Sequence, residues 1–134
     1  MPEEELKVEQ EFQHNLMTKA IAFQSLSGSS EFKNVMSGKK ISTHLFTIFY
    51  KNKDISDNKL SIKLSCVAAK KLGNAVKRNR MRRRLKMATR KAIIEIGEEF
   101  NKKLKYAIFA KPKVYDDNFQ NIVKELTSKL SKVS

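Results

Sequence analysis

The densest group of charged side chains lies between Lys70 and Lys91, where 11 of 22 residues are lysine or arginine. No acidic residue occurs between Asp57 and Glu95. A solvated helix normally mixes both signs, because like charges three or four residues apart repel each other. Arginine can also grip two phosphate oxygens with its planar guanidinium group. The stretch therefore predicts a polyanion-binding surface, although its charge alone also fits a basic helix that is merely solvated.

Residues that could carry catalysis or hold a metal are sparse. The two histidines, His14 and His44, are far apart and have no neighbouring cysteine or pair of carboxylates. A zinc site needs clustered ligands at short spacing, and the sequence contains neither a glycine-rich phosphate loop nor a nucleophile elbow. Cys66, the single cysteine, lies in an alternating apolar run and is predicted to be a small buried side chain. We therefore expect no catalytic residue and no metal ligand in this chain.

The composition narrows the class of partner. The 134 residues suit one domain, and 28 Lys+Arg against 14 Asp+Glu give a net charge of +14. Such an imbalance favours nucleic acid or an anionic membrane surface as partner. No apolar run approaches the roughly 20 residues that span a bilayer, and the acidic start is unlike a signal peptide. We expect a cytoplasmic protein without a membrane partner.

The charge divides the chain into two parts. Residues 1–25 carry a net charge of −3, whereas residues 26–134 carry +17. We interpret residues 1–25 as an acidic N-terminal extension, either disordered or with a short helix over residues 6–23. Translation from Met17 would remove most of this extension. Residues 26–134 are expected to form the folded domain.

The first half of this domain predicts one helix and two strands. A short helical pattern begins at Ser29 and ends at Gly38. Residues 41–50 are rich in β-branched and aromatic side chains and predict a strand. After a polar connection over residues 51–59, residues 60–66 alternate strictly and predict a half-buried strand. Its outward face would carry three polar side chains able to contact an anion: Ser61, Lys63 and Ser65.

The second half predicts two helices separated by a strand. Asn74 is a good N-cap for a long helix to about Phe100. The apolar stripe of this helix consists of Met81, Leu85, Ala88, Ala92, Ile96 and Phe100. Residues 104–110 alternate again and predict a strand that Pro112 ends. Asp116 is expected to cap a last helix, whose stripe consists of Phe119, Ile122, Val123, Leu126 and Leu130.

These elements predict an α+β fold, a single α/β sandwich with one sheet, in the order helix, strand, strand, helix, strand, helix. The apolar stripes of the helices must cover one face of the sheet, so the other face is expected to stay open, at least in part. On a helical wheel, six basic side chains of the long helix lie opposite its apolar stripe: Arg80, Arg83, Arg84, Lys86, Arg90 and Lys91.

The spacing around Asn79 is more specific than the charge. The pattern Leu72-x-x-Ala75-x-x-Arg78-Asn79-Arg80-Met81-Arg82-Arg83-x-Leu85-Lys86 closely resembles the signature of the bacterial ribonuclease P protein family, whose hallmark is the Arg-Asn-Arg element. The preceding Lys70-Lys71-Leu72-Gly73-Asn74-Ala75-Val76 resembles that family's strand-to-helix turn. Weaker similarity extends over residues 26–132, whereas residues 1–25 show no such resemblance.

The resemblance implies a fold of order α-β-β-(β)-α-β-α with an unusual left-handed βαβ crossover. It also implies two partners, a catalytic ribonuclease P RNA and precursor tRNA, whose 5′ leader the assembly would remove. The RNA would hold Mg²⁺ and hydrolyse the phosphodiester bond. The chain would then be a subunit of an endoribonuclease without catalytic residues of its own, and a monomer when isolated.

The resemblance and the charge together indicate two groups of site residues. Those expected to bind ribonuclease P RNA are Lys70, Lys71, Lys77, Arg78, Asn79, Arg80, Arg82, Arg83, Arg84, Lys86 and Arg90. Those expected at a cleft for the single-stranded leader, between the first helix and the open sheet face, are Phe32, Met36, Phe49, Ser61, Lys63 and Ser65. Unpaired bases stack on aromatic side chains, but ordinary core packing is the alternative for Phe32 and Phe49.

Other functions remain open at this point. A ribosomal or general RNA-binding protein would carry a similar basic helix, but it would not restore cleavage by a ribonuclease P RNA at low Mg²⁺. A DNA-binding regulator would normally need a helix-turn-helix partner or a dimer seam, whereas a strand precedes this basic helix. A protein-only nuclease would need a cluster of carboxylates near the basic surface, which the sequence does not provide.

Overall fold

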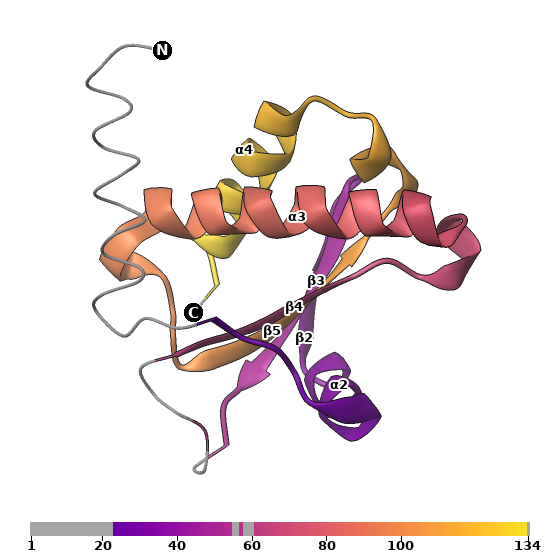
Figure 1. The fold of residues 1–134 in the computed structure, drawn as a ribbon. Coiled ribbons are helices and arrows are strands. Elements are labelled where there is room, and N and C mark those ends of the chain that lie inside the picture. Colours follow the sequence, from indigo (N-terminus) through magenta and orange to yellow (C-terminus); the bar gives the residue numbers. More distant parts are fainter. Residues whose placement is uncertain (1–22, 55–56, 58–60, 134) are drawn as a thin grey trace.

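A mixed β-sheet forms the centre of this computed structural model, which describes residues 23–54, 57 and 61–133. Helices lie on both faces of the sheet (Figure 1). The strands are β1 (Phe23–Gln24), β2 (Lys39–Ser42), β3 (Phe46–Asn52), β4 (Ile62–Val67) and β5 (Leu104–Ala110). The α-helices are α2 (Gly28–Met36), α3 (Ala75–Ile96) and α4 (Phe119–Leu130). Short 3₁₀ turns are η1 (Lys70–Leu72), η2 (Gly97–Glu99) and η3 (Pro112–Tyr115).

The strand order across the sheet is β1-β4-β5-β3-β2. Strand β3 is antiparallel to both β2 and β5, whereas β4 is parallel to β5 and to β1. The chain passes from β4 to its neighbour β5 through α3, which makes a βαβ unit. This arrangement confirms the predicted α+β fold with one sheet. Three strands, β2, β3 and β4, lie between α2 and α3, so the optional third strand of the predicted order α-β-β-(β)-α-β-α is present.

The strand predicted over residues 41–50 is corrected to two strands, β2 and β3, joined by a tight turn. The Oγ1 atom of Thr43 accepts hydrogen bonds from the backbone N–H groups of Leu45 and Phe46, both at 3.2 Å. The N–H group of Thr43 also donates to the carbonyl oxygen of Phe46 at 2.8 Å. Threonine can stabilise a turn through its side chain, so no glycine or proline marks this turn in the sequence.

The folded domain was expected to begin at residue 26, but strand β1 already belongs to the sheet. Phe23 and Gln24, which the sequence analysis assigned to the N-terminal extension, pair in parallel with Ile62 and Lys63. The guanidinium group of Arg90 also lies over the Phe23 ring, 5.2 Å from its centroid. The predicted helix over residues 6–23 otherwise lies outside the described residues.

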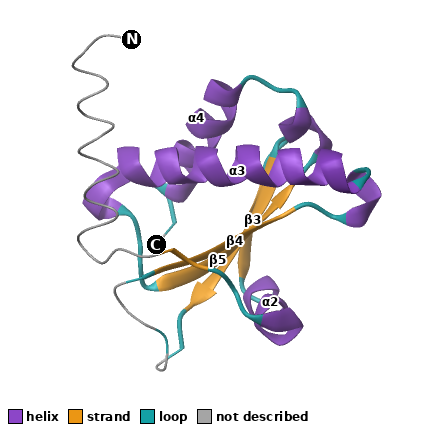
Figure 2. Cartoon of the chain, in the orientation of Figure 1, coloured by secondary structure: helices purple, strands orange, loops and turns teal. Residues whose placement is uncertain are grey.

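The main hydrophobic core fills the space between one sheet face and the two helices α3 and α4, whereas α2 lies on the opposite face (Figure 2). The predicted stripe residues Met81, Leu85, Ala88 and Ala92 are all buried. The stripe of α4 is buried at Ile122, Val123, Leu126 and Leu130. Strand β5 supplies the alternating set that was predicted: Leu104, Tyr106, Ile108 and Ala110. Burial of each large apolar side chain stabilises the fold by about 1.5–3 kcal/mol.

Side-chain caps set the ends of the helices. Asn74 begins α3 as predicted, because its Oδ1 atom accepts a hydrogen bond from the N–H group of Lys77 at 2.9 Å. The same helix ends at Ile96 and not near Phe100, because Gly97 takes a positive φ of 68° that ends the helical path. Helix α4 is capped by Asn118, not by Asp116 as predicted, since η3 occupies the segment before it.

Helix α2 begins earlier than the serine pattern suggested. Its N-cap is Ser27, whose side chain makes no capping hydrogen bond. The Oε1 atom of Glu31 accepts a hydrogen bond from the Ser27 N–H group at 3.1 Å, which replaces one half of a capping box. Gly38 follows the end of the helix as expected, but the reason is space: a Cβ atom there would overlap the carbonyl oxygen of Tyr50.

Candidate nucleic-acid interface

The basic side chains of α3 occupy two flanks of the helix. One flank faces the outer edge of β4 and carries Asn79, Arg82, Arg83 and Lys86, which are all exposed. Between this flank and the strand lies a cavity of about 370 Å³. Its lining consists of Ser25, Leu64, Ser65, Cys66, Asn79, Arg82, Arg83 and Lys86. Half of the lining residues thus lie on α3 and were predicted from the sequence to bind RNA.

The electrostatics of this cavity favour an anion. Three of its lining side chains are cationic, and none of the described residues places a carboxylate in the lining. Arg82 donates a hydrogen bond to the Oδ1 atom of Asn79, which fixes the position of both side chains. Burial raises the pKa of the Cys66 thiol to about 12, so this thiol stays neutral at physiological pH. Sequence reasoning missed Ser25 and Leu64, because the cavity exists only where β1 and β4 meet α3.

The other flank of α3 packs against η3. The Lys77 ammonium and the Arg80 guanidinium lie over the Tyr115 ring, 5.0 Å and 5.3 Å from its centroid. The Nε atom of Arg84 donates to the Val114 carbonyl oxygen at 2.8 Å, and its Nη2 atom donates to the Asp117 carbonyl oxygen. Arg84 is therefore half-buried and supports the fold, which corrects its predicted place on a purely phosphate-facing side of the helix.

We predict that Arg84→Ala destabilises the protein. The substitution leaves the carbonyl groups of Val114 and Asp117 without their donor, and one intramolecular hydrogen bond contributes about 1 kcal/mol to stability. We expect the free energy of unfolding, measured by urea titration, to fall by about 2 kcal/mol. Arg83→Ala, on the exposed side of the same helix, is the matched control. Equal unfolding midpoints for the two variants would show that Arg84 does not stabilise the fold.

The remaining predicted RNA-binding residues lie on η1, in the first turn of α3 and towards the end of α3. Lys70 and Lys71 are exposed on η1. Arg78 is half-buried, and its Nε atom is buried without a hydrogen-bond partner among the described residues. Arg90 is exposed although it lies over Phe23. These positions extend the basic surface along the helix on both sides of the cavity.

A second surface, on the opposite face of the sheet, is aromatic. Phe32 and Phe49 pack at the side of a small cluster around Val35 and Ala107, and both are half-buried. Phe109 joins them, with its ring 5.5 Å from that of Phe49 and perpendicular to it. Sequence reasoning did not name Phe109, although the alternation of β5 puts it on this face. Phe32 and Phe49 thus pack on the core with one side and remain partly exposed on the other. The third predicted apolar residue, Met36, is 43% exposed.

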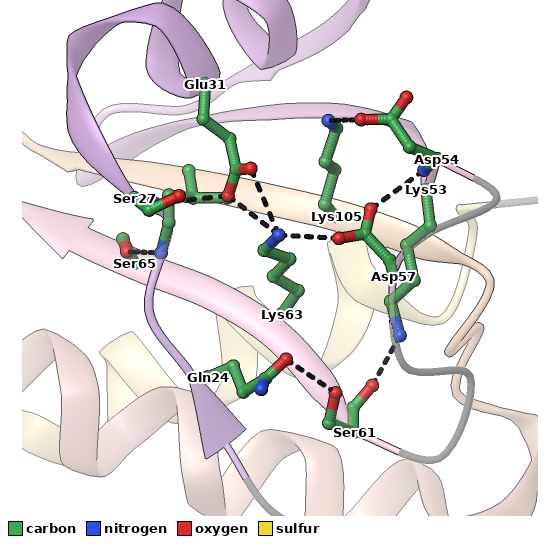
Figure 3. Close-up of polar contacts among 11 residues, drawn as sticks. Gln24, Ser27, Glu31, Lys53, Asp54, Asp57, Ser61, Lys63, Ser65 and Lys105 are labelled. Atoms are coloured by element: carbon green, nitrogen blue, oxygen red, sulfur yellow. Dashed lines mark hydrogen bonds and ion pairs between the residues drawn. The ribbon is translucent and has the colours of Figure 1, made fainter.

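The predicted polar face of β4 is covered, which corrects the expectation of an open face there (Figure 3). Only 1% of Ser61 is exposed, and its hydroxyl donates to the Oε1 atom of Gln24 at 2.9 Å. The hydroxyl of Ser65 accepts a hydrogen bond from the Leu26 N–H group at 2.8 Å. Both serines therefore hold the segment that leads from β1 into α2.

Lys63 is the centre of a charged cluster on this face (Figure 3). Its Nζ atom lies 2.9 Å from a carboxylate oxygen of Glu31 and 2.7 Å from the Oδ1 atom of Asp57. Burial lowers the pKa of Lys63, but the hydrogen bonds to Asp57 and Glu31 outweigh that effect and raise it overall. The hydrogen bond from Lys63 likewise lowers the pKa of Asp57. Lys63 thus ties α2 to the sheet and is not positioned for a nucleic-acid phosphate.

The neighbouring lysine of the sheet, Lys105, also forms an ion pair with a carboxylate. Lys105 is paired with Lys63 in the register of β4 and β5, and only 1% of its side chain is exposed. Its Nζ atom lies 3.3 Å from the Oδ2 atom of Asp54 (Figure 3). This end of the α2-covered face therefore contains paired charges, whereas the other end contains the aromatic side chains.

Comparison with known proteins agrees with this geometry. The family model described as Ribonuclease P matches residues 22–134. The ribonuclease P protein component of Carboxydothermus hydrogenoformans is 34% identical over 103 residues, which cover 75% of this chain and 83% of that protein. The chain belongs to the ribonuclease P protein family. Membership makes it a component of a ribonuclease that has an RNA partner and acts in tRNA processing.

Further relatives support the family assignment and the fold. The ribonuclease P protein component of Mycoplasma mycoides subsp. mycoides is 41% identical over 68 residues, or 50% of this chain and 59% of that protein. The Thermotoga maritima ribonuclease P protein structure has a TM-score of 0.63 at 17% identity, covering 83% of this chain and 98% of that one. The Staphylococcus aureus structure gives 0.61 at 21% identity, with 81% and 95% covered. These two structures show the same fold.

Two further properties of the described residues bear on the family's chemistry. No group of three or more histidine, cysteine, aspartate or glutamate side chains within this part of the chain is placed to hold a metal ion. None of the helices that the structure describes has the length and apolar character needed to cross a membrane.

Proposed function

We propose that this chain binds ribonuclease P RNA through α3 and the 5′ leader of precursor tRNA through the aromatic surface, and so promotes endonucleolytic removal of the leader. One observation carries the proposal. The Arg-Asn-Arg element lies on a helix whose outer flank gathers Asn79, Arg82, Arg83 and Lys86 around one cavity, to which the part of the chain that the structure describes contributes no carboxylate. A rigid, carboxylate-free cluster of guanidinium groups suits the phosphates of a folded RNA.

In this proposal the chain binds and the RNA subunit performs the hydrolysis. The RNA subunit supplies the Mg²⁺ sites, and the metal ions there activate water and stabilise the leaving oxygen. The basic flank of α3 lowers the repulsion between crowded RNA strands, because its cations neutralise phosphate charges. The counterions that each phosphate contact releases add to the affinity. The RNA-processing role places the protein in the cytoplasm, as a monomer before it assembles with the RNA.

The proposed leader site is the aromatic surface formed by Phe32, Met36, Phe49 and Phe109. An unpaired base stacked on an aromatic ring contributes about 1–3 kcal/mol. Exposed lysines on the neighbouring strand β2, Lys39 and Lys40, can attract the leader phosphates. Such contacts favour precursor over mature tRNA, because the product has lost the leader.

Reconstitution tests this function directly. The full chain is mixed with a bacterial ribonuclease P RNA and labelled precursor tRNA at an Mg²⁺ concentration at which the RNA alone is slow. We expect the chain to restore cleavage at the mature 5′ end and to give none without the RNA. A general RNA-binding protein would bind the RNA without restoring cleavage, and a chain that cut precursor unaided would overturn the proposal.

Phe49→Ala separates leader binding from the rest of the assembly. We predict a roughly 5- to 150-fold loss of affinity for precursor tRNA, because one stacked base contributes about 1–3 kcal/mol, and no change for mature tRNA. Binding of the reconstituted holoenzyme to both tRNAs is measured by filter retention. Phe119→Ala, a half-buried phenylalanine that packs on the main core, is the control for general loosening. Equal losses for both tRNAs would exclude Phe49 from the leader site.

A further inference from the structure

The cavity beside β4 has two chemically different walls. The α3 wall carries the cationic groups of Arg82, Arg83 and Lys86. The strand wall carries Leu64 and Cys66, an apolar side chain and a neutral thiol. A ligand that fills this space must therefore combine an anionic group with an uncharged, partly apolar one.

The edge of β4 adds hydrogen-bonding capacity to the strand wall. Strand β1 pairs with β4 only at Ile62 and Lys63. Beyond Lys63, the outer edge of β4 has no partner strand within the described residues. An unpaired strand edge presents backbone N–H and C=O groups to whatever lies beside it. These groups can form hydrogen bonds with the edge of a planar polar group in the cavity.

The size of the cavity excludes a simple phosphate as its full occupant. At about 370 Å³ it lies in the range of sites that enclose small organic ligands, which is about 300–1,000 Å³. A phosphate would contact the guanidinium groups and leave the Leu64 wall bare. A base inside a duplex cannot leave its stack without losing pairing energy, whereas an unpaired RNA base can be splayed into a pocket.

We propose that this cavity holds one unpaired nucleotide of the RNA partner, with its phosphate on Arg82, Arg83 and Lys86 and its base between Leu64, Cys66 and the edge of β4. This inference rests on the proposed function, because it takes the RNA that contacts α3 as the source of the nucleotide. The Asn79 amide and the Ser25 hydroxyl lie on the rim, where they can bond to the base or the ribose. The basic flank would then bind a defined bulged or looped nucleotide as well as a phosphate backbone.

Mononucleotides test the cavity in the full-length chain. Uridine and adenosine 5′-monophosphate are compared with the free nucleosides and with inorganic phosphate by NMR titration. We expect at least one nucleotide to bind at least tenfold more tightly than either its nucleoside or phosphate, with shifts at Leu64 and Cys66. Equal affinity for nucleotides and phosphate would overturn the proposal, because the site would then be an anion site only.

A variant whose cavity is filled by a larger side chain tests the proposal most directly. Ser25 is exposed on the rim, so Ser25→Trp can fill the space without removing a charge or a core contact. We expect it to reduce nucleotide affinity to the level of phosphate, and Ser25→Leu to give a smaller loss. Ser128→Trp, at an exposed position on α4, is the matched control. Unchanged nucleotide binding in both Ser25 variants would overturn the inference.

The same variant distinguishes this inference from the proposed function. In reconstitution with ribonuclease P RNA, Ser25→Trp should weaken assembly about tenfold without changing its salt dependence, because no cation is lost. If Ser25→Trp assembles normally while removal of the α3 charges still weakens binding, the nucleotide site is wrong and the proposed function stands. If neither change affects binding to the RNA, the proposed function itself fails.

Discussion

Replacing Arg82, Arg83 and Lys86 together with glutamine should lower the affinity for ribonuclease P RNA by about a thousandfold or more. Hydrogen bonds to charged groups contribute about 1.5–3 kcal/mol each, and 1.4 kcal/mol corresponds to a tenfold change. The three cations line one cavity, and no carboxylate of residues 23–54, 57 or 61–133 lines it beside them, so these residues do not offset their attraction for phosphate. The loss should therefore be large although the fold is unchanged.

The salt dependence identifies the mechanism of this loss. Each phosphate contact contributes about −0.7 to −0.9 to the slope of log K against log salt. The triple variant should flatten that slope by about two to three units in filter-binding titrations from low to moderate salt.

A matched control removes the same charge elsewhere. Lys103, Lys124 and Lys132 are exposed on parts of the surface away from the cavity, and their replacement by glutamine lowers the net charge equally. We expect this control to change the slope by less than one unit. If both triple variants flattened the slope equally, binding would depend on net charge alone and the α3 flank would have no special role.

Lys63→Met should produce the largest loss of stability. The substitution leaves the carboxylates of Glu31 and Asp57, whose side chains are only 15% and 11% exposed, without their cation. Removing one partner of a buried ion pair typically costs about 3–5 kcal/mol, and the partial exposure here favours the lower end, about 3 kcal/mol. The free energy of unfolding from urea titration measures this effect. α2 should loosen first, because Lys63 and Glu31 connect it to the sheet.

Neutralising the partners should reverse most of this loss. The variant that combines Lys63→Met with Glu31→Gln and Asp57→Asn removes all three charges of the Glu31–Lys63–Asp57 cluster, and we expect it to recover more than half of the lost stability. A triple variant no more stable than Lys63→Met alone would show that packing of the lysine stem, and not charge, accounts for the effect.

The pH dependence of stability provides an independent check on this cluster. The pKa of Asp57 is lowered from its ordinary value of 3.8, so the folded state binds its proton less readily than the unfolded chain. The resulting stabilisation is present above about pH 4 and is lost as the pH falls through the lowered pKa. The wild type should therefore lose stability more steeply than Asp57→Asn in this acidic range. Parallel pH profiles would contradict the assigned ion pair.

The sequence alone determined the features that depend on neighbouring residues. The stripe from Met81 to Ala92 and the alternation from Leu104 to Ala110 predicted α3 and β5, because each element buries a face whose period is local. The Arg-Asn-Arg spacing indicated the family, which the comparisons confirm. Asn74 predicted the start of α3, since a cap acts within one turn of the helix.

Only the tertiary structure decided which charged residues are available to a partner. Lys63 and Arg84 were both predicted to contact RNA, as Arg83 was, yet partners about 30 residues away hold them: Glu31 for Lys63, and the carbonyl groups of Val114 and Asp117 for Arg84. The cavity likewise needs Ser25 and Leu64 beside Arg82. Such contacts depend on how strands and helices pack across the sheet. Periodicity within one segment carries no information about them, so the sequence indicated the family and only the fold brought the residues of the candidate site together.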